Sequence, residues 1–115
     1  MKKQFFGGSK GRCTAVQYNG LVYAVATDTT SASSVAEQTL SALEFLDNIL
    51  KDAGSGKSGL LQATIYLRDM STKEEMDAVW CDWIGEEENW PQRACVGADL
   101  AGRDLIEIVV TARVI

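Results

Sequence analysis

The segment Leu21–Thr27 constrains the fold of this chain more than any other, because its run Leu-Val-Tyr-Ala-Val-Ala is apolar at every position. The run has the length of a strand, and apolar residues on both faces are typical of a strand buried on both sides. It follows the strand-like segment Thr14–Tyr18 after Asn19-Gly20, a dipeptide that favours a two-residue hairpin turn since both residues tolerate positive φ. We therefore expect a hairpin inside a sheet that is covered on both faces.

Two segments have the spacing of amphipathic helices. The first, Ser34–Ala53, opens with the capping box Ser34-x-x-Glu37 and is followed by a glycine, which is a typical residue just after a helix end. The second is predicted over 71–84, with Ser71 or the next residue as its N-cap. Apolar residues recur every three or four positions, which predicts one buried stripe on each helix. These residues are Ala36, Leu40, Leu43, Leu46, Leu50 and Ala53 in the first helix, and Met76, Val79, Trp80, Trp83 and Ile84 in the second.

Three further segments are predicted to be strands, namely Leu60–Arg68, Arg93–Leu100 and Leu105–Ile115. The order of elements is then ββαβαββ, which indicates an α+β fold with a mixed sheet. Two helices can cover only one face of such a sheet. The other face still carries Leu, Val and Tyr, so we expect a second copy of the chain or a larger partner to cover it. On the strand that begins at Leu60, one face is expected to hold Leu61, Ala63, Ile65 and Leu67.

Length and charge exclude several classes of protein. The 115 residues suit one domain spanning 1–115. The formal net charge is −5 and the basic residues are scattered, so we expect no nucleic acid as a partner, because phosphate binding needs clustered Lys and Arg. No apolar run has the length of a membrane span. The chain has no histidine, which excludes Ser-His-Asp and Cys-His catalysis and removes the commonest metal ligand.

The cysteines point to reduced thiols. Cys13, Cys81 and Cys95 are odd in number and lack the spacing of a zinc site, so neither a disulfide framework nor a bound metal or cofactor is expected. This pattern favours a cytoplasmic protein, as does the absence of the long apolar core of a signal peptide at the start of the chain. The stretch Gly54–Ser58 is similar to a phosphate loop, but Lys51 stands where that motif needs a glycine. We expect a flexible turn there.

Arg93 and Glu107 are the candidate functional pair. The planar fork of an arginine suits a carboxylate better than any other side chain does, and Arg93 begins a predicted strand. Glu107 lies mid-strand between two isoleucines, where a carboxylate is costly to bury unless it is used or paired. Its partner is either Arg93, which would make a functional site, or Arg113 on the same face, which would make a structural ion pair.

Cys95 and the tryptophans close to Arg93 in the sequence are each either a core residue or part of a site. Cys95 shares a strand face with Arg93, but no histidine is present to activate the thiol, so a small buried apolar role is favoured. Trp80 and Trp83 lie on the apolar stripe of a helix, which favours core packing over a stacking platform. Trp90 precedes the only proline, Pro91, and is a candidate for the rim of a pocket.

From about Arg12 to its end the chain resembles the RidA/YjgF family of reactive-intermediate deaminases, and within it the YoaB-type branch. The motifs that carry the resemblance keep the family's order and spacing along nearly the whole chain. They are Gln38-x-x-x-x-Leu43, Leu50-x-x-Ala53-Gly54, Ala63-Thr64-Ile65-Tyr66-Leu67-x-Asp69, Trp80-x-x-Trp83, Pro91-x-Arg93-x-x-Val96 and Ile106-Glu107-Ile108 with Ala112.

The resemblance implies a chorismate-mutase-like fold in which three subunits form a central barrel with active sites between them. It also implies hydrolysis of 2-imino or enamino acids to 2-keto acids and ammonia, without metal or cofactor. Arg93 matches the arginine that clamps the substrate carboxylate, Glu107 the glutamate that holds water, and Cys95 a cysteine that offers backbone contacts. Arg12 or Cys13 matches an aromatic residue of the archetype, and Ala26-Thr27 replaces its Ser-Gly-Gln.

Two other functions remain open at this point. One is a non-catalytic trimer that binds small carboxylates or regulates a partner. The other is the ribonuclease or translation-inhibitor activity attached to some relatives, which fits poorly with an acidic chain that lacks histidine.

Overall fold

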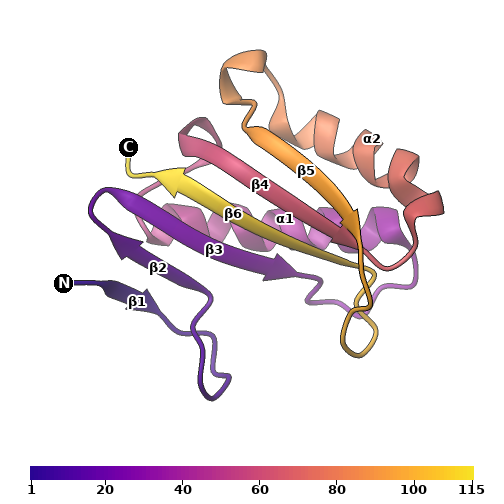
Figure 1. Ribbon diagram of the computed structural model, residues 1–115, viewed down its shortest axis with the longest axis horizontal. Coiled ribbons are helices and arrows are strands. Elements are labelled where there is room, and N and C mark those ends of the chain that lie inside the picture. The colour runs from indigo at the N-terminus through magenta and orange to yellow at the C-terminus, as the bar shows by residue number, and fades with distance from the viewer.

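The computed structural model describes residues 1–115, in which a mixed six-stranded sheet carries two helices on one face (Figure 1). The strands lie in the order β1-β2-β3-β6-β4-β5, and every neighbouring pair is antiparallel except β4 and β5, which are parallel. This arrangement confirms the α+β class and the mixed sheet. The strands are β1 (Lys3–Phe5), β2 (Ala15–Tyr18), β3 (Leu21–Thr27), β4 (Leu60–Leu67), β5 (Gln92–Gly97) and β6 (Ile106–Arg113).

The expected order ββαβαββ lacks one strand, since β1 precedes it. β1 has only three residues, and its pairing with β2 sets Lys3 opposite Gln17 and Phe5 opposite Ala15. A segment this short shows no measurable alternation, so only its partner strand reveals it. The hairpin turn between β2 and β3 is confirmed, because Asn19 and Gly20 have φ values of 51° and 77°.

Helices α1 (Val35–Asp52) and α2 (Lys73–Ile84) begin in different ways. Ser34 caps α1 as expected, since its Oγ accepts from the Glu37 amide at 3.2 Å and donates to Glu37 Oε1 at 2.8 Å. Ser71 does not cap α2. Its hydroxyl and amide both donate to Asp69, so a 3-10 turn over Met70–Thr72 precedes the helix. Neither helix combines the length and apolar character that crossing a membrane requires.

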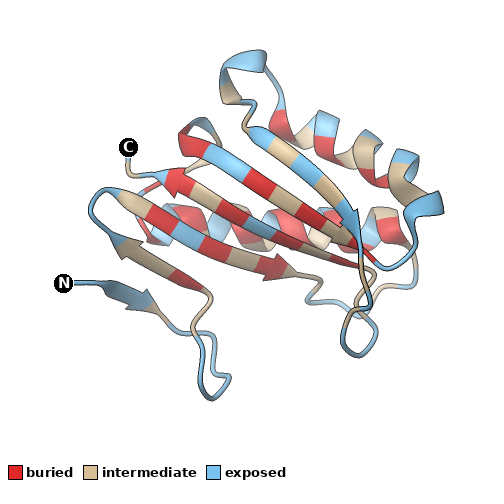
Figure 2. Cartoon of the chain, in the orientation of Figure 1, coloured by how far each residue is buried: buried red, intermediate tan, exposed pale blue.

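The core lies between the sheet and the two helices, where buried and more exposed residues alternate along β3, β4 and β6 (Figure 2). Two expected core residues are exposed, and Ala36 of the expected stripe is only half-buried. Leu40 is half exposed on α1, and Leu61 is exposed because a bulge between Leu60 and Gln62 shifts the alternation of β4 by one residue. Fully buried large residues include Leu43, Leu46, Leu50, Ile65, Leu67, Met76, Ile106 and Ile108.

The glycine-rich stretch after α1 is a structural connector. Ser55 Oγ donates to the Arg113 carbonyl at 2.6 Å, and a Cβ atom on Gly59 would lie 2.6 Å from the same oxygen. Lys57 Nζ donates to the Trp83 carbonyl at 2.7 Å and lies 4.8 Å from the centre of the Trp83 ring. The lysine therefore satisfies the carboxyl end of α2, where a positive charge is favourable, instead of holding phosphate.

Gln38 is a buried polar residue that joins three parts of the chain. Its Nε2 donates to the carbonyls of Ala32 and Arg103 at 2.8 and 3.0 Å, and its Oε1 accepts from the Leu105 amide at 2.8 Å. The side chain is 1% exposed, so water cannot replace these partners. Gln38 thus fixes the loop before α1 against the turn that leads into β6.

We expect Gln38→Leu to lower the free energy of unfolding by roughly 2–4 kcal/mol, because the substitution leaves a buried amide and two carbonyls without partners. Urea unfolding at a fixed protein concentration measures this change. Gln4→Leu is the matched control, since Gln4 is exposed on β1. A loss below about 0.5 kcal/mol for Gln38→Leu would contradict the assigned role.

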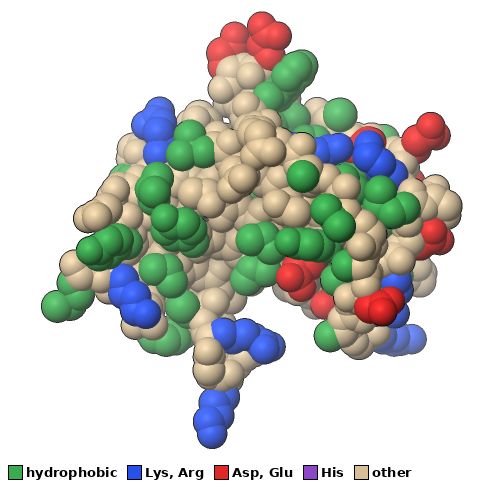
Figure 3. Space-filling view, in the orientation of Figure 1, with side chains coloured by type: hydrophobic (Ala, Val, Ile, Leu, Met, Phe, Trp, Pro, Cys, Tyr) green, Lys and Arg blue, Asp and Glu red, His purple; other side chains and the backbone are tan.

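The second face of the sheet has no helix against it. Tyr23, Val96 and Val109 are 47%, 44% and 38% exposed. Figure 3 looks onto this face and shows hydrophobic side chains gathered over the strands. Exposed apolar side chains gathered on one face are typical of surfaces that contact another chain. The apolar sheet face that the strand pattern predicts is therefore observed, and nothing in the single chain covers it.

Candidate functional site

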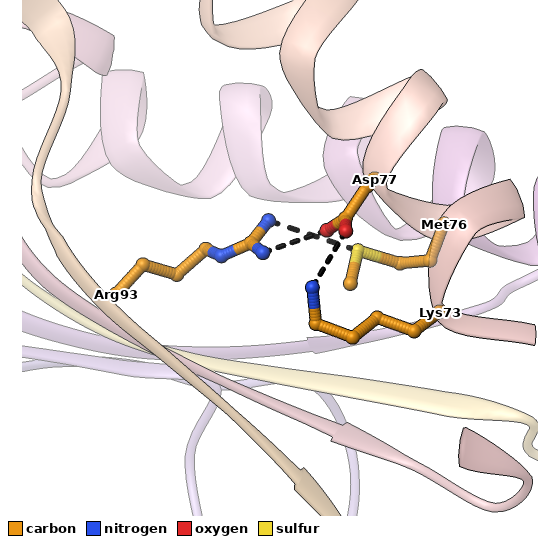
Figure 4. A network of polar contacts seen from close by, with 4 residues as sticks. All are labelled: Lys73, Met76, Asp77 and Arg93. Carbon is orange, nitrogen blue, oxygen red and sulfur yellow. Dashed lines mark hydrogen bonds and ion pairs between the residues drawn. The ribbon is translucent and has the colours of Figure 1, made fainter. Parts of the chain in front are cut away.

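Arg93 lies at the start of the edge strand β5, where the parallel register sets it opposite Ala63 on the helix side of the sheet. Its Nη2 donates to Asp77 Oδ1 at 2.6 Å, and its Nη1 contacts Met76 Sδ at 3.9 Å (Figure 4). Its Cζ lies 5.4 Å from the centre of the Trp80 ring. One turn of α2 therefore holds the guanidinium in place through a charge, a sulfur atom and an aromatic face.

Asp77 lies between two cations, since Lys73 Nζ contacts its other oxygen at 2.7 Å (Figure 4). Burial acts to raise the pKa of Asp77, but hydrogen bonds and positive charge from Lys73 and Arg93 outweigh it and hold the pKa below its usual value. One carboxylate against two cations leaves one unit of positive charge. The cluster can therefore accept an anion, because the guanidinium has N–H donors beyond the one that Asp77 accepts.

Lys73 and Asp77 were not identified as site residues from the sequence. The available signal was their i, i+4 spacing on a predicted helix, which is a common arrangement for a surface ion pair. The contact of Asp77 with Arg93 joins residues 16 positions apart in the chain, so only the packing of α2 against β5 shows it.

A cavity of about 350 Å³ opens beside Arg93. Its walls are mainly aromatic and aliphatic, and Arg93 and Asp77 form its charged end. Trp90 is 61% exposed at this cavity, which agrees with the expected position at a pocket rim. The other residues around it are Trp80, Cys81, Ile84 and Pro91.

Trp80 and Trp83 pack in the structure as the apolar stripe predicts. Trp80 is 5% exposed, and the two ring centres lie 5.4 Å apart. Trp83 Nε1 donates to Asp47 Oδ2 at 2.9 Å, which joins α2 to α1.

Cys95 lies on the same face of β5 as Arg93, opposite Ile65 in the register. It packs partly against the core. Burial raises the pKa of its thiol, and the nearby positive charges of Arg93 and Lys73 oppose this only in part. The thiol is therefore protonated at neutral pH, which disfavours a nucleophilic role.

Glu107 lies on the opposite face of the sheet. In β6 it is set beside Thr27 of β3 and Tyr66 of β4. It lines a second cavity of about 510 Å³ together with Arg12, Cys13 and Thr27. The structure thus brings Arg12 and Glu107 to one cavity, with Thr27 at the position where the resemblance indicates a departure from the archetype.

Asp104 is a further carboxyl group at this second cavity, and no motif or spacing in the sequence singles it out. Burial raises the pKa of Asp104, and the negative charge of Asp28 adds to the increase while Arg68 opposes it. The Arg68 guanidinium donates to the carbonyls of Leu100 and Gly102, which fixes the turn that carries Asp104.

Within one chain the proposed pairing of Arg93 with Glu107 is not formed. Alternate residues of a strand point to opposite faces, and the register assigns Arg93 to the helix side and Glu107 to the open side. The alternative pairing is absent as well, since Arg113 Nη1 contacts only the Val114 carbonyl, at 3.4 Å. A site that contains both Arg93 and Glu107 requires a second chain.

Comparison with known proteins agrees with this architecture. The model of the family described as endoribonuclease L-PSP matches residues 13–114. A RutC family protein from Haemophilus ducreyi is 36% identical over 99 residues, covering 84% of each chain. The RutC family protein YoaB from Escherichia coli is 31% identical over 100 residues, which cover 86% of this chain and 87% of YoaB.

Solved structures show the same fold. A member of the YjgF protein family from Neisseria meningitidis superposes with a TM-score of 0.93 at 36% identity, covering 100% of this chain and 96% of that one. A YjgF-family protein from Mycobacterium tuberculosis has a TM-score of 0.88 at 26% identity, with 99% and 100% covered. The match of nearly the whole chain to the family model and to these relatives shows that the protein belongs to the RidA/YjgF family, whose model bears the name endoribonuclease L-PSP.

Proposed function

We propose that this protein hydrolyses 2-imino and enamino acids to 2-keto acids and ammonia. The observation that carries the proposal is the cluster of Arg93, Asp77 and Lys73, which retains one unit of positive charge at the end of a cavity. A substrate carboxylate neutralises that charge and gains a bidentate partner in Arg93. The carbon of a protonated imine is already electrophilic, so orientation and a held water supply much of the rate.

Glu107 is the proposed base. Water adds to the imine carbon while the Glu107 carboxylate accepts a proton from it, and the C–N bond becomes single. The same carboxyl then returns the proton to the amino nitrogen. Ammonia leaves as the carboxylate takes the hydroxyl proton and the C=O bond of the keto acid forms, and this second proton passes to the departing ammonia, which is released as ammonium. The cycle consumes one water and needs no redox partner.

The catalytic unit is proposed to be a homotrimer, with each site formed between two subunits. Two features support it, namely the uncovered apolar face of the sheet and the placement of Arg93 and Glu107 on opposite faces. Closed rings of identical subunits juxtapose different surfaces of neighbouring chains, so one chain supplies Arg93 and the next supplies Glu107 and Arg12.

The family description endoribonuclease indicates another activity, which fits this chain less well. Its net charge is −5 and it has no histidine, so it offers neither a basic surface for a phosphate backbone nor the usual acid–base residue. The direct test is release of ammonia from freshly generated 2-iminopropionate. Release above the rate in buffer alone supports the proposal, whereas binding of 2-keto acids without any hydrolysis would make the chain a carboxylate-binding protein instead.

If the site lies between subunits, two inactive variants can complement each other in a mixed trimer, whereas a site within one chain does not allow this. Arg93→Ala and Glu107→Gln should each lose activity alone. When the two variants are unfolded, mixed in equal amounts and refolded together, about a quarter of the sites in random trimers regain both residues. We therefore expect the mixture to recover about a quarter of the wild-type rate of imine hydrolysis.

Light scattering on the same samples should give three times the 12.5 kDa mass of one chain. The two variants mixed without unfolding serve as the control, because their subunits remain separate. A refolded mixture no more active than this control, or a stable monomer at micromolar concentration, would reject the intersubunit site.

A further inference from the structure

We infer that the cavity beside Arg93 is a side-chain subsite for 2-imino and 2-keto acids that carry a large aromatic or branched apolar group. The inference rests on the proposed function and specifies its substrate class. The feature that carries it is the combination of a carboxylate-binding arginine at one end and an aromatic wall along the rest of the same cavity.

The cavity has the size and chemistry of such a subsite. Its volume of about 350 Å³ lies within the ~300–1,000 Å³ typical of small-molecule sites. Trp80 supplies a wall that also contacts the guanidinium of Arg93, at 5.4 Å. Ile84 and Pro91 add further apolar surface to the same cavity. A ligand whose carboxylate binds Arg93 therefore directs its side chain along apolar walls.

Trp90 forms the outer wall, and the protein holds it in an exposed position. Its Nε1 donates to the Gly85 carbonyl at 2.9 Å, and its amide donates to the Glu87 carbonyl at 3.0 Å. Asn89 Nδ2 donates to the Ile84 carbonyl at 3.0 Å, which ties the same loop to the end of α2. An indole that is fixed yet 61% exposed leaves an apolar face without a partner in the chain.

The position of these walls determines which size of ligand side chain binds best. The methyl group of a pyruvate-sized ligand reaches only the region next to Arg93 and leaves the indole of Trp90 in water. A benzyl or isobutyl group reaches past Trp80 to Trp90 and removes the exposed indole face of Trp90 from water, which stabilises the complex. The cavity thus favours the larger acids.

Calorimetry with pyruvate and phenylpyruvate tests the inference on the wild-type protein. We expect the dissociation constant for phenylpyruvate to be at least ~10-fold lower than that for pyruvate, because an additional aromatic ring is buried. In Trp90→Ala the dissociation constant for pyruvate divided by that for phenylpyruvate should fall towards one. In Trp90→Phe this ratio should stay close to the wild-type value. Tyr18→Ala is the matched control, since Tyr18 is a 47% exposed aromatic residue on β2, which three strands separate from β5, and it should keep the wild-type ratio.

Cys81 reports where the ligand lies, because its exposed thiol is part of the same cavity. Phenylpyruvate should slow the alkylation of Cys81 by N-ethylmaleimide, as measured by peptide mass spectrometry, and should slow it less in Trp90→Ala.

The possible failures are distinguishable. Equal affinity for both acids, a ratio unaffected by Trp90→Ala, or alkylation of Cys81 unaffected by phenylpyruvate would overturn the aromatic subsite while leaving the Arg93 clamp intact. If neither acid binds, or if both bind Arg93→Ala as well as wild type, the proposed function itself fails.

Discussion

Replacing Arg93 with alanine should weaken the binding of pyruvate or 2-ketobutyrate by roughly 2–5 kcal/mol, because a charge-assisted bidentate partner of the carboxylate is lost. This corresponds to a ~30-fold to several-thousand-fold rise in the dissociation constant, measured by calorimetry. The fold should survive, since Asp77 keeps Lys73 as its partner at 2.7 Å.

Two further variants give the Arg93 experiment its specificity. Arg93→Lys should restore little affinity, because an ammonium group lacks the planar fork and cannot keep both Asp77 and a ligand carboxylate in geometry. Arg113→Ala is the control for a general loss of positive charge, since Arg113 is exposed and forms no ion pair. Equal affinity of wild type and Arg93→Ala would reject Arg93 as the clamp.

Replacing Glu107 with glutamine should lower the turnover of imine hydrolysis by ~10²–10⁴-fold, which is the usual contribution of a general base. Glutamine keeps the shape and can still hold a water, but it cannot accept a proton. We therefore expect the variant to stay trimeric and to bind 2-keto acids nearly as the wild type does. Ammonia release and keto-acid calorimetry on the same preparation separate these two quantities.

Cys95→Ala provides the comparison for Glu107→Gln. The thiol of Cys95 has a raised pKa and its proposed contacts come from the backbone, so its loss should change turnover only slightly. The opposite pattern, in which Glu107→Gln unfolds and Cys95→Ala loses activity, would make Glu107 a structural residue and Cys95 the reactive group.

Helices and long strands could be predicted because their signals are local. Leu21–Thr27 is observed with the expected bounds, and Ser34 caps α1 through the motif that indicated it. The errors arose where a distant segment decides the outcome. The bulge at Leu61 depends on the register of β4 with β6, and the three-residue β1 exists only through its pairing with β2.

For the candidate site, too, local features could be predicted and contacts between distant segments could not. The sequence by itself determined which residue types are present for chemistry, namely an arginine and a glutamate on two successive strands of a chain without histidine, because identity and spacing are local properties. It also determined that one sheet face lacks a cover, since two helices cannot cover both.

Only the tertiary structure decided which side chains meet. It placed Asp77 of α2 between Lys73 and Arg93, and it set Arg93 and Glu107 on opposite faces of the sheet. Both outcomes follow from strand register and helix docking, which join residues far apart in the chain. A shift of one residue in register moves a side chain to the other face, and no local pattern specifies that shift for a short edge strand such as β5.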